Sequence, residues 1–117
     1  FQLGNVYYSL KNYDEAIRAY NDFLDRYSGH PLLPIVKQSL GYAYEEKGLL
    51  QEAVKQFDEI SADGNSFLVA QGNWDAGRCY EKLGQASDAI RSYTKVIELS
   101  PNSNWATMSQ YRLSVIR

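Results

Sequence analysis

Few side chains in this sequence could act as nucleophiles or general bases. Cys79 is the only cysteine and His30 the only histidine. A reactive cysteine needs a partly exposed, electropositive setting with a base nearby. Cys79 instead stands between Gly77 and Tyr80 in an apolar stretch, which predicts a buried, space-filling thiol. His30 precedes Pro31 in a predicted loop, so we expect a solvent-facing turn residue and not a catalytic base.

Neighbouring carboxylates are the second feature that could do chemistry, because burial can separate their pKa values into an acid and a base. The three pairs are Asp14 with Glu15, Glu45 with Glu46, and Asp58 with Glu59. All three fall at polar positions of amphipathic stretches, which predicts solvated surface. Asp63 and Asn65 form an acidic turn that lacks the length and closing Glu of a calcium loop. No phosphate-binding glycine loop, zinc-protease motif or nucleophile elbow is present. We therefore expect a protein that is not an enzyme, with no catalytic residue, no metal and no cofactor.

Length and composition limit the remaining classes of function. The chain has 117 residues, which fits one domain, and a net charge of −2. A nucleic-acid-binding surface needs a basic patch, so we expect no nucleic-acid partner. No apolar run reaches the length of a membrane span, so we expect no direct membrane insertion by this segment. Because the sequence begins at Phe1 and not at Met, we expect a fragment of a longer protein.

A repeat organises the whole chain. The phrase apolar–Gly–x–x–Tyr occurs three times, and a second phrase, Ala–x–x–x–aromatic, begins 12 residues after each glycine. The glycines are Gly4, Gly41 and Gly77, and Ser114 takes the fourth place. The small residue lets two helices approach closely, and the aromatic ring of the second helix fills the space beside it. The pattern predicts seven helices, over residues 1–10, 13–27, 33–47, 50–61, 67–83, 86–99 and 103–116.

Short signals mark the ends of these helices. Gly48 and Gly84 suit the left-handed position that follows a helix. Asn12, followed three residues later by Glu15, resembles a capping box at the start of the second helix. Pro101 can occupy the first turn of the last helix.

These phrases resemble the tetratricopeptide repeat (TPR). The resemblance implies an all-α fold, a right-handed α-solenoid of antiparallel helical hairpins. It places hairpins at about 1–30, 31–66 and 67–101, followed by the first helix of a fourth at 102–117, in a single TPR domain. The early Trp of the family is missing from every copy, and the spacing exceeds the family's usual ~34 residues. The extra residues fall around 28–31 and 62–66, where they should alter the superhelical twist.

The resemblance also implies a function: a protein-binding scaffold that holds a peptide or helix of a partner in a concave groove. Carried over by register, the groove residues are Asn5, Tyr8, Gln38, Tyr42, Glu45, Gln71, Trp74, Arg78 and Glu81, with Phe1, Tyr111 and Val115 continuing the rows. Tyr, Trp and Arg are enriched at binding hot spots. Alternatively, Tyr42 and Trp74 only pack against neighbouring helices.

One binding mode of the family can be tested on the sequence. TPR domains that grip the C-terminal carboxylate of Hsp70 and Hsp90 use lysine, asparagine and arginine. The corresponding residues here are Phe1, Asn5, Ser39, Gln71 and Asp75. Only Asn5 matches, and Asp75 would repel a carboxylate. We therefore expect no carboxylate clamp.

A finer resemblance concerns the cellular setting. The stretch Tyr93 … Pro101-Asn102-Ser103-Asn104-Trp105-Ala106 … Arg112-Leu113 and the phrase at 77–84 resemble bacterial envelope TPR proteins of the Tol-Pal coordinator and translocon-associated types. That resemblance implies a bacterial periplasmic protein, or one anchored in a membrane and facing the periplasm. Similar junctions occur in cytoplasmic TPR proteins, which leaves the cytoplasm as an alternative. Two other functions stay open: self-association through the end helices, giving a homo-oligomer, and an accessory domain of a larger enzyme.

Overall fold

The computed structural model describes residues 1–62 and 68–116, and helices account for most of them. The helices are α1 (Gln2–Ser9), α2 (Tyr13–Arg26), α3 (Leu33–Glu46), α4 (Leu50–Ala62), α5 (Val69–Lys82), α6 (Ala86–Leu99) and α7 (Asn104–Ile116). The all-α prediction is confirmed, and each predicted helix end lies within two residues of the observed one. The predicted turn at Asp63 and Asn65 lies outside the described residues.

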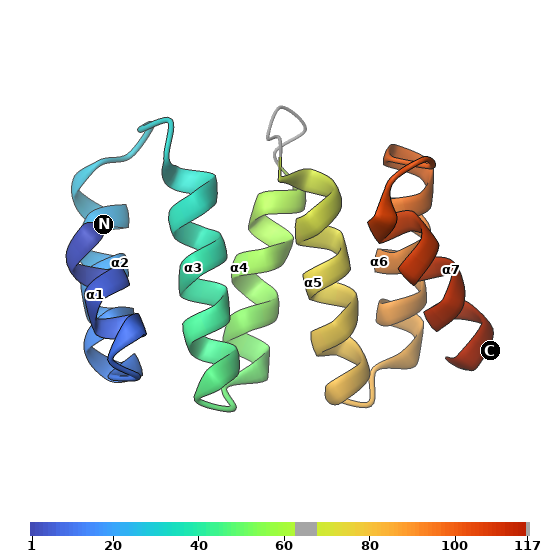
Figure 1. Cartoon of the computed structure of the whole chain (residues 1–117), viewed down its shortest axis with the longest axis horizontal. Coiled ribbons are helices and arrows are strands. Elements are labelled where there is room, and N and C mark those ends of the chain that lie inside the picture. The colour runs from blue at the N-terminus through green and yellow to red at the C-terminus, as the bar shows by residue number, and fades with distance from the viewer. Residues whose placement is uncertain (63–67, 117) are drawn as a thin grey trace.

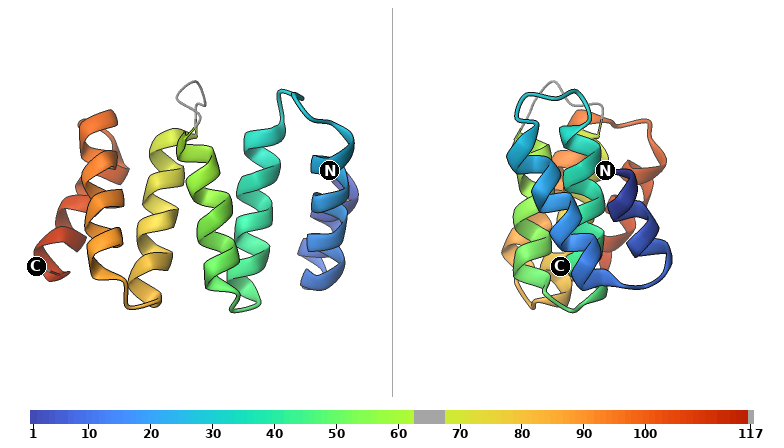
Figure 2. Two further views of the ribbon diagram at one scale, coloured as in Figure 1. Left: turned by 180° about the vertical axis from the view of Figure 1, so that it is seen from behind. Right: turned by 90° about the vertical axis from the view of Figure 1, so that its left-hand side faces the viewer.

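The helices form two layers (Figures 1 and 2). α1, α3, α5 and α7 lie in one layer, and α2, α4 and α6 lie in the other. Each helix packs against the next along the chain, and α5 also contacts α7 directly. The two termini lie at opposite ends of an array measuring 39 × 28 × 19 Å. We call the surface of the first layer the odd-helix face. The junctions between successive hairpins are numbered one to three from the N-terminus.

Each hairpin is closed by a glycine set against a buried aromatic ring. A Cβ atom on Gly41 would lie 2.5 Å from the ring of Phe57, much closer than side-chain atoms approach one another. The other two pairs are Gly4 with Tyr20 and Gly77 with Tyr93, with the same close approach. The three rings are almost fully buried. The sequence prediction that a small residue faces a large aromatic across each hairpin is confirmed.

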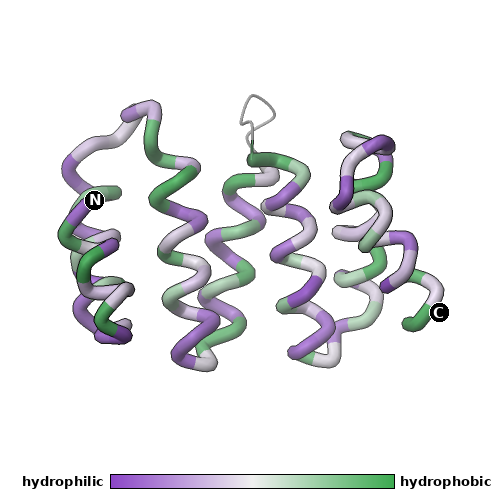
Figure 3. Tube along the Cα trace, in the orientation of Figure 1, coloured by the Kyte–Doolittle hydropathy of each residue, from purple (hydrophilic) through white to green (hydrophobic). Residues whose placement is uncertain are grey.

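The apolar interior falls into two clusters. Figure 3 shows hydrophobic and hydrophilic residues interspersed along the helices that supply them. The smaller cluster joins the first hairpin to α3 around Tyr20 and Leu40. The larger cluster runs from α4 to α7 around Phe57 and Tyr93. Cys79 is fully buried in the larger cluster, and burial raises the pKa of its thiol to about 12. Its prediction as a space-filling residue is confirmed.

The turn inside each hairpin has one residue in the left-handed region. Gly48 and Gly84 have φ values of 81° and 75°, as predicted. Lys11 occupies the equivalent position of the first hairpin with φ 61°. This conformation costs a residue with a Cβ about 1 kcal/mol of free energy, whereas glycine adopts it without that cost.

Replacing Lys11 by glycine should therefore stabilise the protein. We expect Lys11→Gly to raise the free energy of unfolding by about 0.5 kcal/mol, because relief of strain exceeds the extra entropy of the unfolded chain. Urea denaturation measures the change. Lys11→Ala keeps the Cβ and serves as the control, so equal stabilities for the two variants would contradict this explanation.

Two predictions about helix starts need correction. Asn12 Oδ1 accepts a hydrogen bond from the Glu15 amide at 3.4 Å, but the Glu15 side chain pairs with Arg18, so only half of a capping box forms. Pro101 lies in an exposed turn before α7 and not in its first turn. Ser103 begins that helix instead, because its Oγ accepts a hydrogen bond from the Ala106 amide at 3.1 Å.

His30 is also more enclosed than predicted. It is partly buried, and its ring lies against Phe23 at 5.4 Å and Tyr27 at 6.1 Å. Its Nδ1 accepts a hydrogen bond from the Leu32 amide at 3.1 Å. The side chain therefore shapes the turn between α2 and α3, because it links the turn backbone to Phe23 of α2 and to Tyr27 just after that helix.

Candidate functional site

The predicted groove residues divide by junction. Those of α1 border an open recess at the first junction. Those of α3 and α5 mostly contact one another across the second junction, and Glu81 reaches α7 across the third. The polar positions therefore differ in whether their side chains are already engaged inside the chain.

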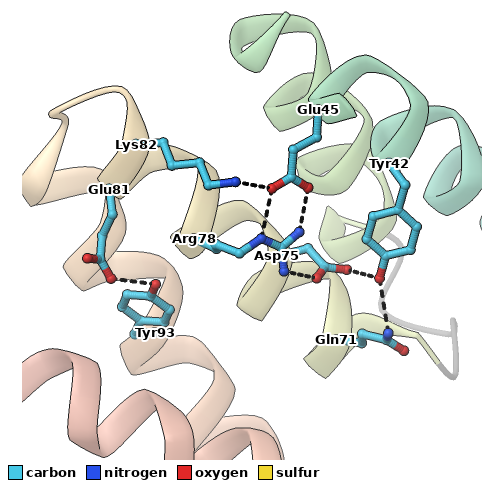
Figure 4. Close-up of polar contacts among 8 residues, drawn as sticks. All are labelled: Tyr42, Glu45, Gln71, Asp75, Arg78, Glu81, Lys82 and Tyr93. Atoms are coloured by element: carbon cyan, nitrogen blue, oxygen red, sulfur yellow. Dashed lines mark hydrogen bonds and ion pairs between the residues drawn. The ribbon is translucent and has the colours of Figure 1, made fainter. Parts of the chain in front are cut away.

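Tyr42 links α3 to α5 at the second junction (Figure 4). Its hydroxyl donates to Asp75 Oδ2 at 2.8 Å and accepts from Gln71 Nε2 at 3.1 Å. Burial, reinforced by the Asp75 carboxylate, raises the pKa of Tyr42 well above its usual value. The phenol is therefore a neutral donor with both of its polar functions used.

Arg78 is the centre of the second junction. Its Nε and Nη2 bind both oxygens of Glu45 at 2.9 and 2.6 Å, and its Nη1 binds Asp75 Oδ1 at 2.8 Å. Lys82 adds a bond to Glu45 at 2.7 Å, and the guanidinium carbon lies 6.0 Å from the ring centroid of Tyr42. We call the six residues Tyr42, Glu45, Gln71, Asp75, Arg78 and Lys82 the Arg78 cluster.

Two carboxylates in the Arg78 cluster respond oppositely to their surroundings. Asp75 is only 2% exposed, and this burial raises its pKa even though Arg78 attracts its charge. Desolvation also acts on Glu45, but hydrogen bonds from Arg78 and Lys82 outweigh it and lower the pKa. The cluster therefore holds buried charge that depends on Arg78 for its compensation.

The third junction repeats this arrangement with other residues. Glu81 accepts hydrogen bonds from the Tyr93 hydroxyl at 2.7 Å and from Arg112 Nε at 2.9 Å. The Nη2 group of Arg112 binds the second oxygen of Glu81. Figure 4 shows the Glu81–Tyr93 contact beside the Arg78 cluster. An arginine thus joins a carboxylate across both the second and the third junction.

The Glu81–Arg112 pair should make the attachment of α7 sensitive to acid. Hydrogen bonds from Arg112 hold the pKa of Glu81 below its usual value. A carboxylate with a depressed folded pKa contributes stability above its unfolded pKa and loses that contribution as the pH falls through the folded pKa. We expect the urea midpoint to fall between about pH 7 and about pH 3, and to fall less in Glu81→Gln. Glu98→Gln, on an exposed part of α6, is the control; an equal fall in all three proteins would rule the explanation out.

The first junction has a recess where the other two have an ion pair. Its volume is about 250 Å³, and its lining comes from α1, α2 and α3. The lining residues are Asn5, Tyr8, Ser9, Tyr20, Ser39 and Tyr42. The hydroxyl of Tyr20 donates to Asn5 Oδ1 at 2.6 Å, and the ring of Tyr8 stands edge-on to Tyr13 at 5.3 Å. Small-molecule sites usually measure roughly 300–1,000 Å³, so the recess is closer in size to one side chain of a peptide.

The remaining predicted positions have simpler surroundings. Trp74 packs on Tyr93 of the next helix, with ring centroids 5.3 Å apart, as the alternative interpretation predicted. Gln38 is partly exposed on α3. Phe1 packs against α2, whereas Tyr111 and Val115 are exposed on α7.

Two of the carboxylates predicted to be solvated are not. The Glu45 side chain is 12% exposed and lies in the Arg78 cluster. Asp58 is half-buried and accepts a hydrogen bond from the Tyr80 hydroxyl at 2.5 Å. Burial raises the pKa of Asp58. Both lie at helix positions that a neighbouring hairpin covers, which the polar phase of a single helix does not reveal.

Three residues of these junctions were missing from the predicted groove: Asp75, Lys82 and Arg112. Asp75 and Arg78 are three residues apart on α5, a spacing that places them on one side of a helix. The sequence therefore held a signal for that pair. Arg112 lies on the next hairpin, and only the packing of α5 on α7 brings it to Glu81.

Two features of the described residues bear on other classes of function. Within residues 1–62 and 68–116, His, Cys, Asp and Glu side chains form no group of three or more that could hold a metal ion. In the same part of the chain, no helix combines the length and the apolar character needed to cross a membrane.

The sequence matches two protein-family models along most of its length. A tetratricopeptide repeat model matches residues 1–67, and a second tetratricopeptide repeat model matches residues 68–103. The chain belongs to the tetratricopeptide repeat family. The helical hairpins are therefore TPR units, and the odd-helix face is formed by the first helix of each unit.

Two relatives of this TPR chain come from mammals. It is 31% identical over 102 residues to human DnaJ homolog subfamily C member 7. The matched region covers 82% of this chain and 18% of that protein. It is 28% identical over 111 residues to rat RNA polymerase II-associated protein 3, which covers 89% of the chain and 15% of that protein. The chain therefore spans less than a fifth of the length of either relative.

One similar solved structure contains a bound peptide. The first TPR domain of Spaghetti (RPAP3), bound to the HSP90 peptide SRMEEVD, has a TM-score of 0.76 and 26% identity. The match covers 97% of this chain and 86% of that one. The TPR solenoid predicted from the sequence is confirmed.

Proposed function

We propose that this chain is a non-catalytic scaffold that holds a peptide or helix of a partner protein against the odd-helix face. The observation that carries the proposal is the recess at the first junction, which is bordered by the predicted binding residues Asn5, Tyr8 and Tyr42. Protein recognition is the general role of TPR units, and the RPAP3 domain binds a peptide. A side-chain-sized recess on an extended helical face suits a peptide segment better than a metabolite.

The chemistry of the recess argues against a carboxylate clamp in this chain. Phe1 and Ser39 stand where a clamp has lysine and asparagine. Asp75 stands where a clamp has arginine, and its charge is committed to Arg78 and Tyr42. We therefore propose that the partner segment is recognised through aromatic packing and through hydrogen bonds to neutral side chains of this chain.

Crosslinking in cells tests the proposal. A photoreactive phenylalanine analogue in place of Tyr8 keeps an aromatic side chain at the recess without disturbing the Arg78 cluster. The matched control carries the same analogue at Lys55, an exposed position on α4. We expect a discrete adduct from position 8 that is absent from position 55. Adducts of equal yield and identity from both positions, or none from position 8, would count against the odd-helix face as the working surface.

Exposed apolar side chains favour self-association as a second candidate function. Leu3 and Val6 on α1 and Leu10 just after it are 54–70% exposed, and Tyr111 and Val115 on α7 are 65% and 52% exposed. Exposed apolar surface on the two end helices would suit an interface between copies of the chain. Sedimentation at increasing concentration separates the candidates: a mass that rises and then falls back in Leu3→Gln would favour self-association, whereas a constant monomer mass favours the scaffold.

The cellular setting remains the prediction made from the sequence. The resemblance of the 101–106 junction supports a bacterial envelope protein, while the named relatives come from human and rat. We propose the periplasmic setting, with the cytoplasm as the alternative. Fractionation of the host cell, followed by detection of the protein, tests it directly. The role of accessory domain in a larger enzyme is tested by the sequence of the full reading frame.

A further inference from the structure

Two of the three junctions contain an arginine supplied by the chain itself. At the second, Arg78 binds Glu45, and at the third, Arg112 binds Glu81. Glu45 and Glu81 occupy the same repeat position, four residues after the glycine. A guanidinium at this point of the odd-helix face is therefore a recurring part of the architecture, placed between consecutive first helices.

The first junction lacks this arginine and has a recess in its place. The repeat position of Glu45 and Glu81 is filled by Tyr8, and the residues of α3 equivalent to Asp75 and Arg78 are Ser39 and Tyr42. Tyr8, Ser39 and Tyr42 all line the recess of about 250 Å³. Every lining residue is a tyrosine, a serine or an asparagine, so the lining carries aromatic and neutral polar side chains but no cationic one.

Negative charge lies close to the recess. Tyr8 lines it, and the pKa of Tyr8 is raised first by burial and then by the charge of Glu46. Glu46 is exposed, and no cation pairs with it among the residues that the structure describes. The neighbouring Lys47 is paired with Asp14 of α2. The electrostatic environment of the recess therefore favours a cation and disfavours a carboxylate.

We propose that the first-junction recess binds an arginine side chain of the partner, which takes the place that Arg78 and Arg112 occupy at the other two junctions. This inference rests on the proposed function and adds the chemistry of the residue recognised. The precedent lies in the same chain: the Arg78 guanidinium lies 6.0 Å from the ring centroid of Tyr42, within the range of cation–π attraction.

The recess can satisfy a guanidinium in two ways. Tyrosine rings attract a cation placed over their faces, and Arg is the cation most often found there. Serine hydroxyls and the Asn5 amide oxygen can accept hydrogen bonds from its five N–H groups. A carboxylate inserted there would lose hydration without gaining a cationic partner, which is costly.

The test uses pentapeptides of sequence Gly-Gly-X-Gly-Gly, acetylated and amidated at their ends, titrated into the ¹⁵N-labelled chain and followed by NMR. X is arginine, citrulline, lysine or glutamate. Citrulline is the neutral isostere of arginine and therefore isolates the effect of charge. We expect the arginine peptide to shift the amide signals of Asn5 and Ser39 and to bind at least about 5-fold more tightly than the citrulline peptide at low salt. We expect lysine to bind less tightly than arginine, because its ammonium cannot stack on a ring.

Variants locate the site. Glu46→Gln should reduce the preference for arginine over citrulline, and Tyr8→Leu should weaken binding of the arginine peptide at least about 3-fold. Glu52→Gln, an exposed carboxylate on α4, removes the same charge away from the recess and should change neither value. Unchanged spectra outside the recess would show that each variant is folded.

The outcomes separate this inference from the proposed function. Equal or tighter binding of the citrulline or glutamate peptide at the recess would overturn the arginine inference and leave the scaffold intact. No shift at Asn5 or Ser39 with any peptide would also overturn it, and the scaffold would then be judged by the crosslinks from position 8. Tighter binding of lysine than of arginine would reject the guanidinium as the group recognised.

Discussion

The Arg78→Met variant should lose about 3 kcal/mol of unfolding free energy, the cost usually seen when one member of a buried ion pair is removed. Asp75 is 2% exposed, and without Arg78 its carboxylate would keep only the Tyr42 hydroxyl as a close polar partner. Glu45 would keep Lys82. Methionine preserves most of the apolar stem, so the loss reports the charge and not the packing. Urea denaturation followed by circular dichroism measures it.

Two further variants assign this loss to the buried carboxylate. Adding Asp75→Asn to Arg78→Met should restore about half of the stability, because the uncompensated charge is removed. Arg91→Met removes an arginine whose side chain is 67% exposed and paired with Asp88, and it should cost about 0.5 kcal/mol or less. If Arg78→Met and Arg91→Met cost the same, the Arg78 cluster does not contribute as described.

The second large effect is expected at the glycines that face aromatic rings. Gly41→Val should destabilise the protein by about 3 kcal/mol, the upper end of the usual cost of overpacking. Its Cβ would already lie 2.5 Å from the ring of Phe57, which is fully buried. Thermal and urea denaturation both measure the loss.

The controls distinguish crowding from helix propensity. Gln51→Val introduces the same β-branched residue at an exposed position of α4 and should cost roughly 0.5 kcal/mol. Combining Gly41→Val with Phe57→Leu should cost less than the sum of the single changes, because the smaller side chain makes room for valine. Additive costs would mean that the glycine and the ring do not oppose one another.

The sequence predicted the fold well because the repeated residues reflect steric requirements within one hairpin. Gly41 and Phe57 indicate that two helices approach closely, and Gly48 indicates a left-handed turn. Each of these features can be predicted without knowing the neighbouring hairpin. Three copies in register then set the order of the helices. Pro101 was misplaced because Ser103 is the better capping residue and starts the helix two residues later.

The candidate site was harder to predict for a physical reason. Repeat register puts Tyr42, Glu45 and Arg78 on the correct helices, but it does not say which side chains neutralise one another between hairpins. That pairing depends on distances across a junction, which no periodicity within one helix encodes. The recess was hard to predict for the same reason, because it forms where Ser39 and Tyr42 stand at the repeat positions of Asp75 and Arg78.

The division of the core into two clusters has a consequence for how the protein opens. Stability in repeat proteins comes from each unit and its contact with the next, so regions joined by fewer buried groups can unfold separately. α1 and α2 depend on the smaller cluster, and Tyr44 is an apolar side chain that packs against both clusters. The amide hydrogens of α1 and α2 should therefore exchange with solvent faster than those of α5 and α6. A partner that enters the recess would contact side chains from both clusters, such as Tyr8 and Tyr42. Its binding would therefore also stabilise the folded state of the first hairpin.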